Sequence, residues 1–306
     1  MSETIEKFNK HVMQTYGRLP IVLEKGHNDD AVDENGKEYI DFGSGIGTNS
    51  LGYCNDKWAD AVCAQARAIQ HTSNYFYTKV QADFAAKLCE LTGYTDVFFG
   101  NSGAEANECA IKLARKYSFD KYGKGRHTIV TLVNSFHGRT LATLSATGQD
   151  VFHNYFFPFV EGFVNVPAND IDALRKLIAE DKTICAVMFE FVQGEGGVNP
   201  LDKAFVDEIF KLCGENDILT VADEVQTGVG RTGAILTSMR YGVKPDITTL
   251  AKGIAGGVPM GACLADEKCA GVLVKGTHGS TFGGNPLACA GGNVVLDTVS
   301  SEGFCD

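Results

Sequence analysis

Two residues of the sequence stand where an apolar strand would end and could do nucleophilic or acid–base chemistry. Asp223 lies near the end of the apolar run 217–224, and Lys252 follows the run 247–251. A buried carboxylate is costly unless it pairs with a cation or accepts hydrogen bonds, so Asp223 requires a partner. Burial lowers the pKa of a lysine, and the neutral amine can form a Schiff base with a carbonyl group. A lysine that extends its charged end into water is the alternative for Lys252.

Two further segments could hold an anion and a planar ring. The segment 100–108 (GNSGAEANE) would open a helix with small residues, and the free N–H groups there suit a phosphate. An ordinary helix start explains the same residues, with Ser102 as N-cap and Glu105 completing a capping box. The segment 134–140 (NSFHGRT) puts an aromatic ring, a histidine and an arginine in one tight loop. They could stack on and orient a ligand, or form a surface turn.

A glycine-rich segment at 190–197 (EFVQGEGG) carries several polar groups. It places Glu190, Gln193 and Glu195 in a flexible loop after a buried strand. Paired carboxylates indicate acid–base or ion-pair work. A sugar-cleaving enzyme would use such a pair, but no other segment supports a sugar site.

A second glycine-rich segment, 276–290, places the hydroxyls of Ser280 and Thr281 where they could donate hydrogen bonds to phosphate oxygens. The sequence contains no G-x-x-x-x-G-K-[ST], H-E-x-x-H or G-x-S-x-G motif, which argues against the commonest nucleotide, zinc-protease and serine-hydrolase sites. The segment 228–233 matches G-x-G-x-x-G, but it does not start directly at a strand end. The next acidic residue, Asp246, is also too close for a nicotinamide site.

Alternating strands and helices are needed to bring these segments together. The sequence predicts a hairpin over 31–41 around an Asn-Gly turn and strands at 94–100, 127–133, 184–190, 217–224, 247–251 and 260–265. It predicts helices at 57–70, 79–91, 103–118, 170–180, 201–214, 266–275 and 286–300. This alternation indicates an α/β fold with a mostly parallel sheet and helices on both faces. Ligands of such folds bind beyond the carboxyl ends of the strands.

Composition argues against several other classes of protein. The 306 residues carry a net charge of −11, unlike a nucleic-acid binder with its basic stripe. We expect no membrane association, because no run approaches the ~18 apolar residues of a spanning helix, and the polar first residues do not resemble a secretory signal. The ten cysteines form no C-x-x-C pair and predict no metal site. We expect reduced core cysteines in a cytoplasmic protein, among them Cys63, Cys109, Cys185 and Cys213.

A phosphate cradle, a stacking aromatic ring, a strand-end aspartate and a strand-end lysine are the groups that pyridoxal phosphate requires. From about Tyr16 to about Leu296 the chain resembles the class III, pyridoxal-phosphate-dependent aminotransferases. The motifs that carry the resemblance occur in the family's order: GNSGAEANE, NSFHGRT, QGEGGV, ADEVQTGVGRTG, the lysine in LAKGIAGG, and HGSTFGGNPLACA.

The resemblance implies roles for individual residues. Lys252 would bind the cofactor covalently, and Asp223 would pair with its ring nitrogen. The whole cofactor set implied in this way is Gly103, Ala104, Phe136, Asp223, Glu224, Val225, Gln226, Lys252 and Thr281. For the substrate the resemblance implies Arg139, Glu195 and Ser280. Arg139 would hold a carboxylate, and Ser280 and Thr281 would reach the site of the partner subunit.

The resemblance also implies a fold type I architecture and a homodimer with shared sites. Its domain plan assigns 1–55 to the N-terminal segment of a small domain, 56–285 to a large cofactor-binding domain and 286–306 to the start of a C-terminal segment. Members of the family are longer than this chain. We therefore expect the remaining C-terminal segment to be missing, together with an arginine that would pair with Glu195.

The implied activity moves an amino group from N-acetylornithine or a related ω-amino acid to 2-oxoglutarate, giving a semialdehyde and glutamate, in arginine biosynthesis. Ornithine, succinylornithine and 4-aminobutyrate are alternative donors that would use the same cofactor residues. A shortened chain that binds the cofactor without catalysis is a further alternative.

Overall fold

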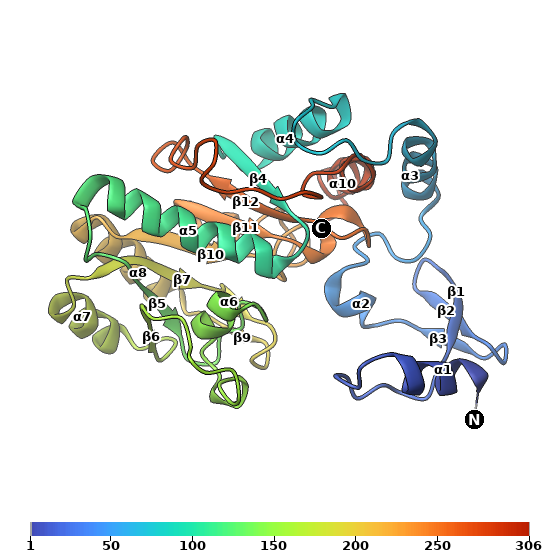
Figure 1. Cartoon of the computed structure of the whole chain (residues 1–306), viewed down its shortest axis with the longest axis horizontal. Coiled ribbons are helices and arrows are strands. Elements are labelled where there is room, and N and C mark those ends of the chain that lie inside the picture. Colours follow the sequence, from blue (N-terminus) through green and yellow to red (C-terminus); the bar gives the residue numbers. More distant parts are fainter. Residues whose placement is uncertain (1, 306) are drawn as a thin grey trace.

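A seven-stranded sheet forms the centre of the computed structural model, which describes residues 2–305 (Figure 1). In spatial order its strands are β4 (Asp96–Gly100), β12 (Gly261–Ala265), β11 (Ile247–Leu250), β10 (Leu219–Asp223), β7 (Ile184–Phe189), β5 (Thr128–Leu132) and β6 (Phe163–Val166). Neighbouring strands are parallel except at β12, which runs antiparallel to both β4 and β11. The predicted mostly parallel α/β fold is confirmed.

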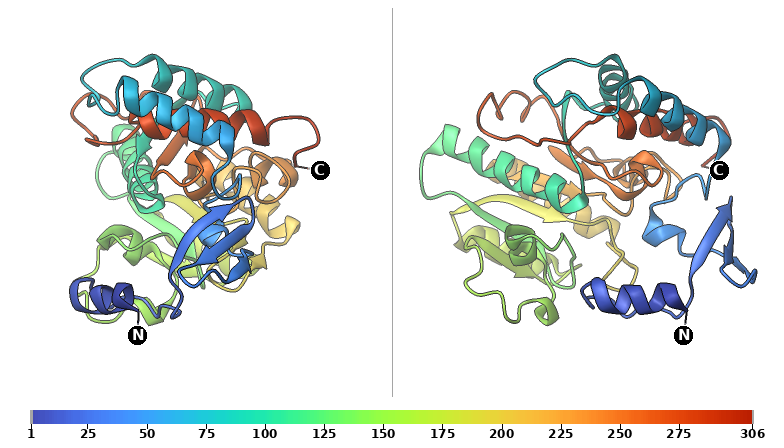
Figure 2. Two further views of the ribbon diagram at one scale, coloured as in Figure 1. Left: turned by 90° about the vertical axis from the view of Figure 1, so that its right-hand side faces the viewer. Right: turned by 45° about the vertical axis from the view of Figure 1, so that its right-hand side comes forward.

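Helices cover both faces of this sheet (Figures 1 and 2). On one face lies α5 (Gly103–Tyr122), which packs against the side chains of Cys263 and Ala265. Ala262 and Leu264 alternate with them along β12 and point to the other face. That face is covered by α4 (Lys79–Thr92), α7 (Ile171–Glu180), α8 (Lys203–Asn216) and α10 (Pro286–Val299).

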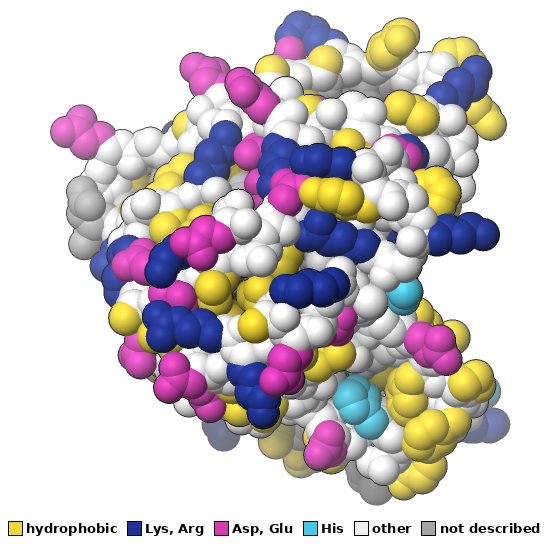
Figure 3. Space-filling model, turned by 90° about the vertical axis from the view of Figure 1, so that its left-hand side faces the viewer, with side chains coloured by type: hydrophobic (Ala, Val, Ile, Leu, Met, Phe, Trp, Pro, Cys, Tyr) yellow, Lys and Arg dark blue, Asp and Glu magenta, His cyan; other side chains and the backbone are white. Residues whose placement is uncertain are grey.

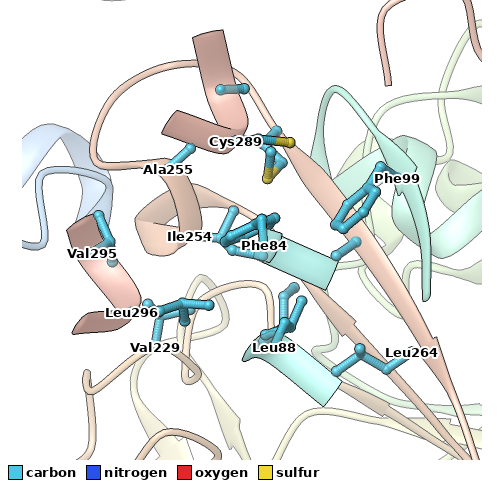
Figure 4. Packing of buried hydrophobic residues seen from close by; sticks show 14 of the residues in the cluster. Phe84, Leu88, Phe99, Val229, Ile254, Ala255, Leu264, Cys289, Val295 and Leu296 are labelled. Atoms are coloured by element: carbon cyan, nitrogen blue, oxygen red, sulfur yellow. The ribbon is translucent and has the colours of Figure 1, made fainter. Parts of the chain in front are cut away.

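The packing under α4 fixes the segment that follows β11 (Figure 4). Phe84 and Leu88 of α4 are completely buried against Ile254 and Leu296. Ile254 belongs to the 3-10 turn η2 (Lys252–Ala255), which begins with the strand-end lysine. Burying a large apolar side chain stabilises by roughly 1.5–3 kcal/mol. The core therefore holds this turn, and with it the backbone of Lys252, in one place.

The start of α5 is set by side-chain caps and by a close approach of β12. The Ser102 Oγ accepts a hydrogen bond from the Glu105 N–H at 3.2 Å, as the capping-box prediction requires. The Glu105 carboxylate does not complete the box; it accepts from the N–H and side-chain amide of Asn101, at 2.7 and 2.8 Å. Gly261 of β12 lies directly against the Ser102 backbone.

The N-terminal part forms a separate three-stranded antiparallel sheet (Figures 1 and 2). Its strands are β1 (Leu23–His27), β2 (Asp30–Asp33) and β3 (Glu38–Ile40), preceded by α1 (Glu3–His11) and followed by the short α2 (Ser44–Gly47) and by α3 (Asp56–Ala68). The predicted hairpin around Asn35-Gly36 is confirmed. Helix α10 packs on α3 and α4. The domain boundaries at 55/56 and 285/286 stay a prediction.

Two predictions on local structure are wrong. Residues 266–275 form turns instead of a helix; Gly271 has φ +72°, and Val272 and Leu273 are packed onto the cluster under α5. Cys63 is exposed, whereas Cys109, Cys185 and Cys213 are buried as predicted. Several short elements were not predicted from the sequence: η1 (Asp150–Phe152), α6 (Leu141–Ala146), α9 (Thr237–Tyr241), β8 (Val192–Gln193) and β9 (Asn199–Pro200), besides α1, α2, β1 and β6.

Charges of both signs share the side of the molecule where α5 ends (Figure 3). Ion pairs there include Lys116 with Asp120 and Lys121 with Asp217. Exposed pairs of this kind stabilise by only about 0–1 kcal/mol. Between residues 2 and 305, no helix combines the length and the apolar character that crossing a bilayer demands.

Replacing Gly261 by alanine should destabilise the protein by about 1–3 kcal/mol, because the added Cβ would lie 2.2 Å from the Ser102 carbonyl oxygen. Gly214→Ala in α8 is the matched control. Its Cβ would meet no atom within 4 Å, and alanine in a helix should stabilise by up to about 1 kcal/mol. Urea unfolding of both variants measures the difference, and a Gly261→Ala protein as stable as the parent would contradict the close approach.

Candidate active site

The carboxyl ends of β7, β10 and β11 and the start of α5 surround a cavity of about 410 Å³. Asp223 and Lys252 both line it, although they lie on different strand ends. The other predicted site residues on its wall are Gly103, Ala104, Phe136, Arg139, Glu195, Val225 and Gln226. Residues from five separate motifs therefore meet in one place, at the edge of the sheet where ligands of parallel folds bind.

Asp223 is 3% exposed and is held by donors from three parts of the chain. Its Oδ2 accepts from the side-chain amide of Asn107 at 2.7 Å and lies 2.8 Å from Nδ1 of His137. Its Oδ1 accepts from the N–H of Val225 at 3.0 Å. Asn107 is oriented in turn by Thr249 of β11, whose hydroxyl donates to its amide oxygen at 2.7 Å. The partner that the sequence analysis required for Asp223 is this set of donors.

His137 follows Phe136 in the segment 134–140, and the sequence gives it no role of its own. Its side chain is fully buried. Burial disfavours its charged form, but the hydrogen bond to Asp223 and the negative charges of Asp223 and Glu190 outweigh burial and raise its pKa. Its Nε2 is buried and has no hydrogen-bond partner among the described residues.

Lys252 is half-buried and has an unusual backbone conformation. Its φ of +46° lies in the left-handed region, which is strained for a residue with a side chain and is found most often at functional sites. Burial lowers the pKa of its amine, against the opposing negative charges of Asp223, Glu190 and Glu195. A neutral amine, the form that reacts with carbonyl groups, is therefore easier to reach here than on a surface lysine.

Glu190 is a second buried acid on the cavity wall, 6% exposed. Burial raises its pKa to about 7, and the charge of Asp223 adds to this effect. Its Oε2 accepts a hydrogen bond from the N–H of Phe136 at 3.0 Å. The carboxyl group thus fixes the backbone that presents the Phe136 ring.

Arg139 and Glu195 are the exposed charged residues on the cavity wall. The Arg139 guanidinium lies 4.1 Å from the centre of the Phe152 ring and 5.5 Å from that of Phe136. Glu195 accepts a hydrogen bond from the side chain of Gln149. Stacking leaves the edge of a guanidinium group free for a planar carboxylate.

Some predicted residues lie outside this cavity. The Glu224 carboxylate accepts from the N–H groups of Thr237 and Ser238, the latter at 2.9 Å, so its side chain holds α9 in place. Gln193 donates to the carbonyl of Val133 at 2.8 Å and is also structural.

Ser280 and Thr281 line a neighbouring cavity within the same chain. The Ser280 Oγ accepts from the side-chain amide of Asn101 at 3.2 Å. Their contact with a partner's site stays a prediction.

Glu190→Gln should change how stability depends on pH. A carboxyl group with an ordinary pKa of 4.5 and a pKa of about 7 in the folded protein stabilises fully below pH 4.5 and loses that contribution as the pH rises to about 7. Without ligand, the free energy of unfolding of the variant minus that of the parent should therefore be about 2–3 kcal/mol larger at pH 8 than at pH 5. Urea unfolding at both pH values measures this gain, and the exposed Glu24→Gln is the control. If variant and parent differ by the same free energy of unfolding at both pH values, the raised pKa of Glu190 is refuted.

Comparison with known proteins places this geometry in a family. The model of the class III aminotransferase family matches residues 12–306. The acetylornithine aminotransferase of Haemophilus ducreyi is 53% identical over 286 residues, which cover 94% of this chain and 72% of that protein. The enzyme of that name from Methanocaldococcus jannaschii is 47% identical, with 96% of this chain and 74% of that protein covered.

Solved structures agree. The ornithine aminotransferase of Toxoplasma gondii superposes with a TM-score of 0.95 at 35% identity, over 99% of this chain and 72% of that one. The acetylornithine aminotransferase of Elizabethkingia anophelis gives 0.84 at 36% identity, over 96% and 71%. The chain thus spans about three quarters of the length of these relatives. It belongs to the class III aminotransferases, enzymes that depend on pyridoxal phosphate.

Proposed function

We propose that this chain transfers the side-chain amino group of N-acetylornithine to 2-oxoglutarate, in the cytoplasm and as a step of arginine biosynthesis. The proposal rests on one observation above all: a single cavity is lined by the half-buried Lys252, the buried Asp223 and the exposed guanidinium group of Arg139. The names of the curated relatives, at 45–53% identity, supply the substrate.

The residues on the cavity wall fit pyridoxal phosphate. The first N–H groups of a helix have no intrahelical acceptor, so those of Gly103 and Ala104 are available to a phosphate. The Phe136 ring would cover one face of the cofactor, and Asp223 and Gln226 would contact its ring. Bound there, the cofactor supplies an electron-accepting ring and a carbonyl carbon that amines attack.

Asp223 has the chemistry to keep a proton on a ring nitrogen. Its buried carboxylate is held in one orientation by the side chains of Asn107 and His137 and by the N–H of Val225. An ionised carboxylate beside a ring nitrogen favours the protonated form of that nitrogen. Because Asn107 and His137 are themselves held by the fold, Asp223 needs no rearrangement when charge develops, which is how preorganised groups accelerate a reaction.

Lys252 is the group that would bind the cofactor and move protons. Burial lowers the pKa of its amine, so the neutral form that can act as a base is easier to reach than on a surface lysine. Its Nζ would take the proton from the amine-bearing carbon of the substrate and return it on the cofactor side. The strained backbone and the anchored turn η2 keep the amine on the cavity wall while it does so.

Arg139 and Glu195 would select the substrates. A guanidinium group binds a carboxylate through two parallel hydrogen bonds, which suits the α-carboxylate of an amino acid or of 2-oxoglutarate. Glu195 would discriminate between a cationic donor and a dicarboxylate acceptor through its charge. Neither residue has a buried ion-pair partner among residues 2–305.

We further propose a homodimer in which Ser280 and Thr281 complete the partner's site. Tyr75, Phe76 and Tyr77 form an exposed aromatic segment, and Phe282 beside Thr281 is also exposed. The Asn74 side chain joins this segment to the loop through hydrogen bonds to the carbonyls of Ser280 and Gly283. A large exposed apolar surface of this kind is typical of a protein interface.

Borohydride reduction of the yellow protein should attach a pyridoxyl group to Lys252 alone, because this lysine combines a lowered pKa with a place on the cavity wall. Peptide mass spectrometry locates the label. Lys252→Ala should abolish turnover, while the exposed Lys25→Ala should not. A label on any other lysine would refute the assignment.

Steady-state kinetics with matched donors tests the substrate. We expect kcat/KM for N-acetylornithine to exceed that for ornithine and 4-aminobutyrate by about tenfold or more, the ratio that one well-placed polar contact supports. A preference for ornithine, succinylornithine or 4-aminobutyrate would move the function to that donor. Cofactor binding without turnover of any donor would favour a non-catalytic role.

A further inference from the structure

A second cavity, of about 300 Å³, lies between α5, β12 and the turns that follow β12. Three cysteines line it: Cys109 from α5, Cys263 from β12 and Cys269 from the next turn. All three are 1–2% exposed. The proposed transamination uses none of them.

A short chain of polar groups leads from the surface to Cys109. The Lys112 ammonium donates to the carbonyl of Thr277 and to Nδ1 of His278, both at 2.9 Å. An ammonium group can only donate, so Nδ1 is the acceptor and the His278 proton lies on Nε2. The imidazole is also fixed by Phe98, whose ring centre is 4.5 Å away. His278 and Cys109 line the same cavity.

The neighbouring thiols of Cys109 and Cys263 are chemically unequal. A hydrogen bond from the Cys263 thiol, followed by His278 and the charge of Lys112, lowers the pKa of Cys109 to about 6 against the opposing effect of burial. The same hydrogen bond and burial raise the pKa of Cys263 well above its ordinary value. Cys109 thus ionises more readily than Cys263, which is the inequality that a nucleophile and its resolving partner need.

We propose that Cys109 and Cys263 are a peroxide-reactive thiol pair that closes to a disulfide. The Cys109 thiolate attacks hydrogen peroxide: an S–O bond forms, the O–O bond breaks, and the released hydroxide takes up a proton to become water. The Cys263 sulfur then attacks the Cys109 sulfur. An S–S bond forms, the S–O bond breaks, and the departing hydroxide leaves as water with the Cys263 proton. The two thiols give up two electrons, and one peroxide becomes two waters.

The thiol pair is connected to the hydrogen bonds that hold Asp223 through one strand pairing and one helix. Cys263 pairs with Thr249 across β12 and β11, and Thr249 orients Asn107. Cys109 follows Asn107 by two residues on α5. A disulfide requires its sulfur atoms to be about 2.05 Å apart, closer than two unbonded thiols can approach. Closure therefore draws α5 towards β12 and disturbs the donor that Asn107 supplies to Asp223.

Mass spectrometry tests the site. The purified protein, loaded with its cofactor, is treated with a small excess of hydrogen peroxide at pH 7, denatured in an alkylating agent and digested. We expect a peptide pair joined by Cys109 and Cys263. The proposal would be overturned if the alkylating agent still labels Cys109 after the exposed Cys54 and Cys63 have been oxidised. A link from Cys109 to Cys269 would overturn it as well.

Variants separate the roles. Cys263→Ser should leave Cys109 as a sulfenic acid that dimedone captures, and Cys109→Ser should give neither product, whereas Cys63→Ser should behave as the parent. Lys112→Met removes the ammonium group that fixes His278, together with its charge, and should slow disulfide formation by about twofold or more, because that charge is the smallest of the effects that lower the pKa of Cys109. An unchanged rate in this variant would refute the activation of Cys109 by Lys112 and His278.

Turnover tests the connection to Asp223. Oxidised parent protein should lose most of its activity and recover it with dithiothreitol, and Cys109→Ser should keep its activity in peroxide. Full activity in protein shown by mass spectrometry to carry the Cys109–Cys263 bond would overturn the connection. If no donor is turned over at all, absorbance of the bound cofactor before and after oxidation provides the same comparison.

Discussion

The buried carboxylate of Asp223 is the constraint on which the rest of the active site depends. At the end of a strand and 3% exposed, its oxygens meet polar groups from the backbone of Val225, the side chain of Asn107 and the ring of His137. Thr249 orients Asn107 from a neighbouring strand. The site therefore exists only when α5, β10, β11 and the loop after β5 are all in place.

Close approaches of backbone segments allow these elements to meet. At Gly194 a Cβ would lie 2.0 Å from the Gln226 side chain, and at Gly103 it would lie 2.7 Å from that of Val225. Both glycines stand where one active-site segment crosses another. Neither glycine has a positive φ, so their backbone conformation does not require glycine. What these positions require is the space that a side chain would fill. Any larger residue would push apart the two segments that form the cavity wall.

The electrostatics of the cavity follow from burying several like charges around one amine. Burial lowers the pKa of Lys252, and the acids Asp223, Glu190 and Glu195 limit that effect. The same burial raises the pKa of Glu190 to about 7, whereas Asp223 has three hydrogen-bond donors. The two acids on the cavity wall thus have different surroundings, and different surroundings are how a fold assigns carboxyl groups different tasks.

The sequence by itself determined the α/β class, most of the strands and long helices, and the strand-end positions of Asp223 and Lys252, because hydrophobic periodicity and caps depend on near neighbours in the chain. Only the tertiary structure decided which groups hold Asp223, since Asn107 and His137 are 116 and 86 residues away from it. It also turned Glu224 away from the cavity, because its carboxylate caps α9. Hydrogen bonds over such distances leave no local pattern, so only the packing of the sheet and its helices can select them.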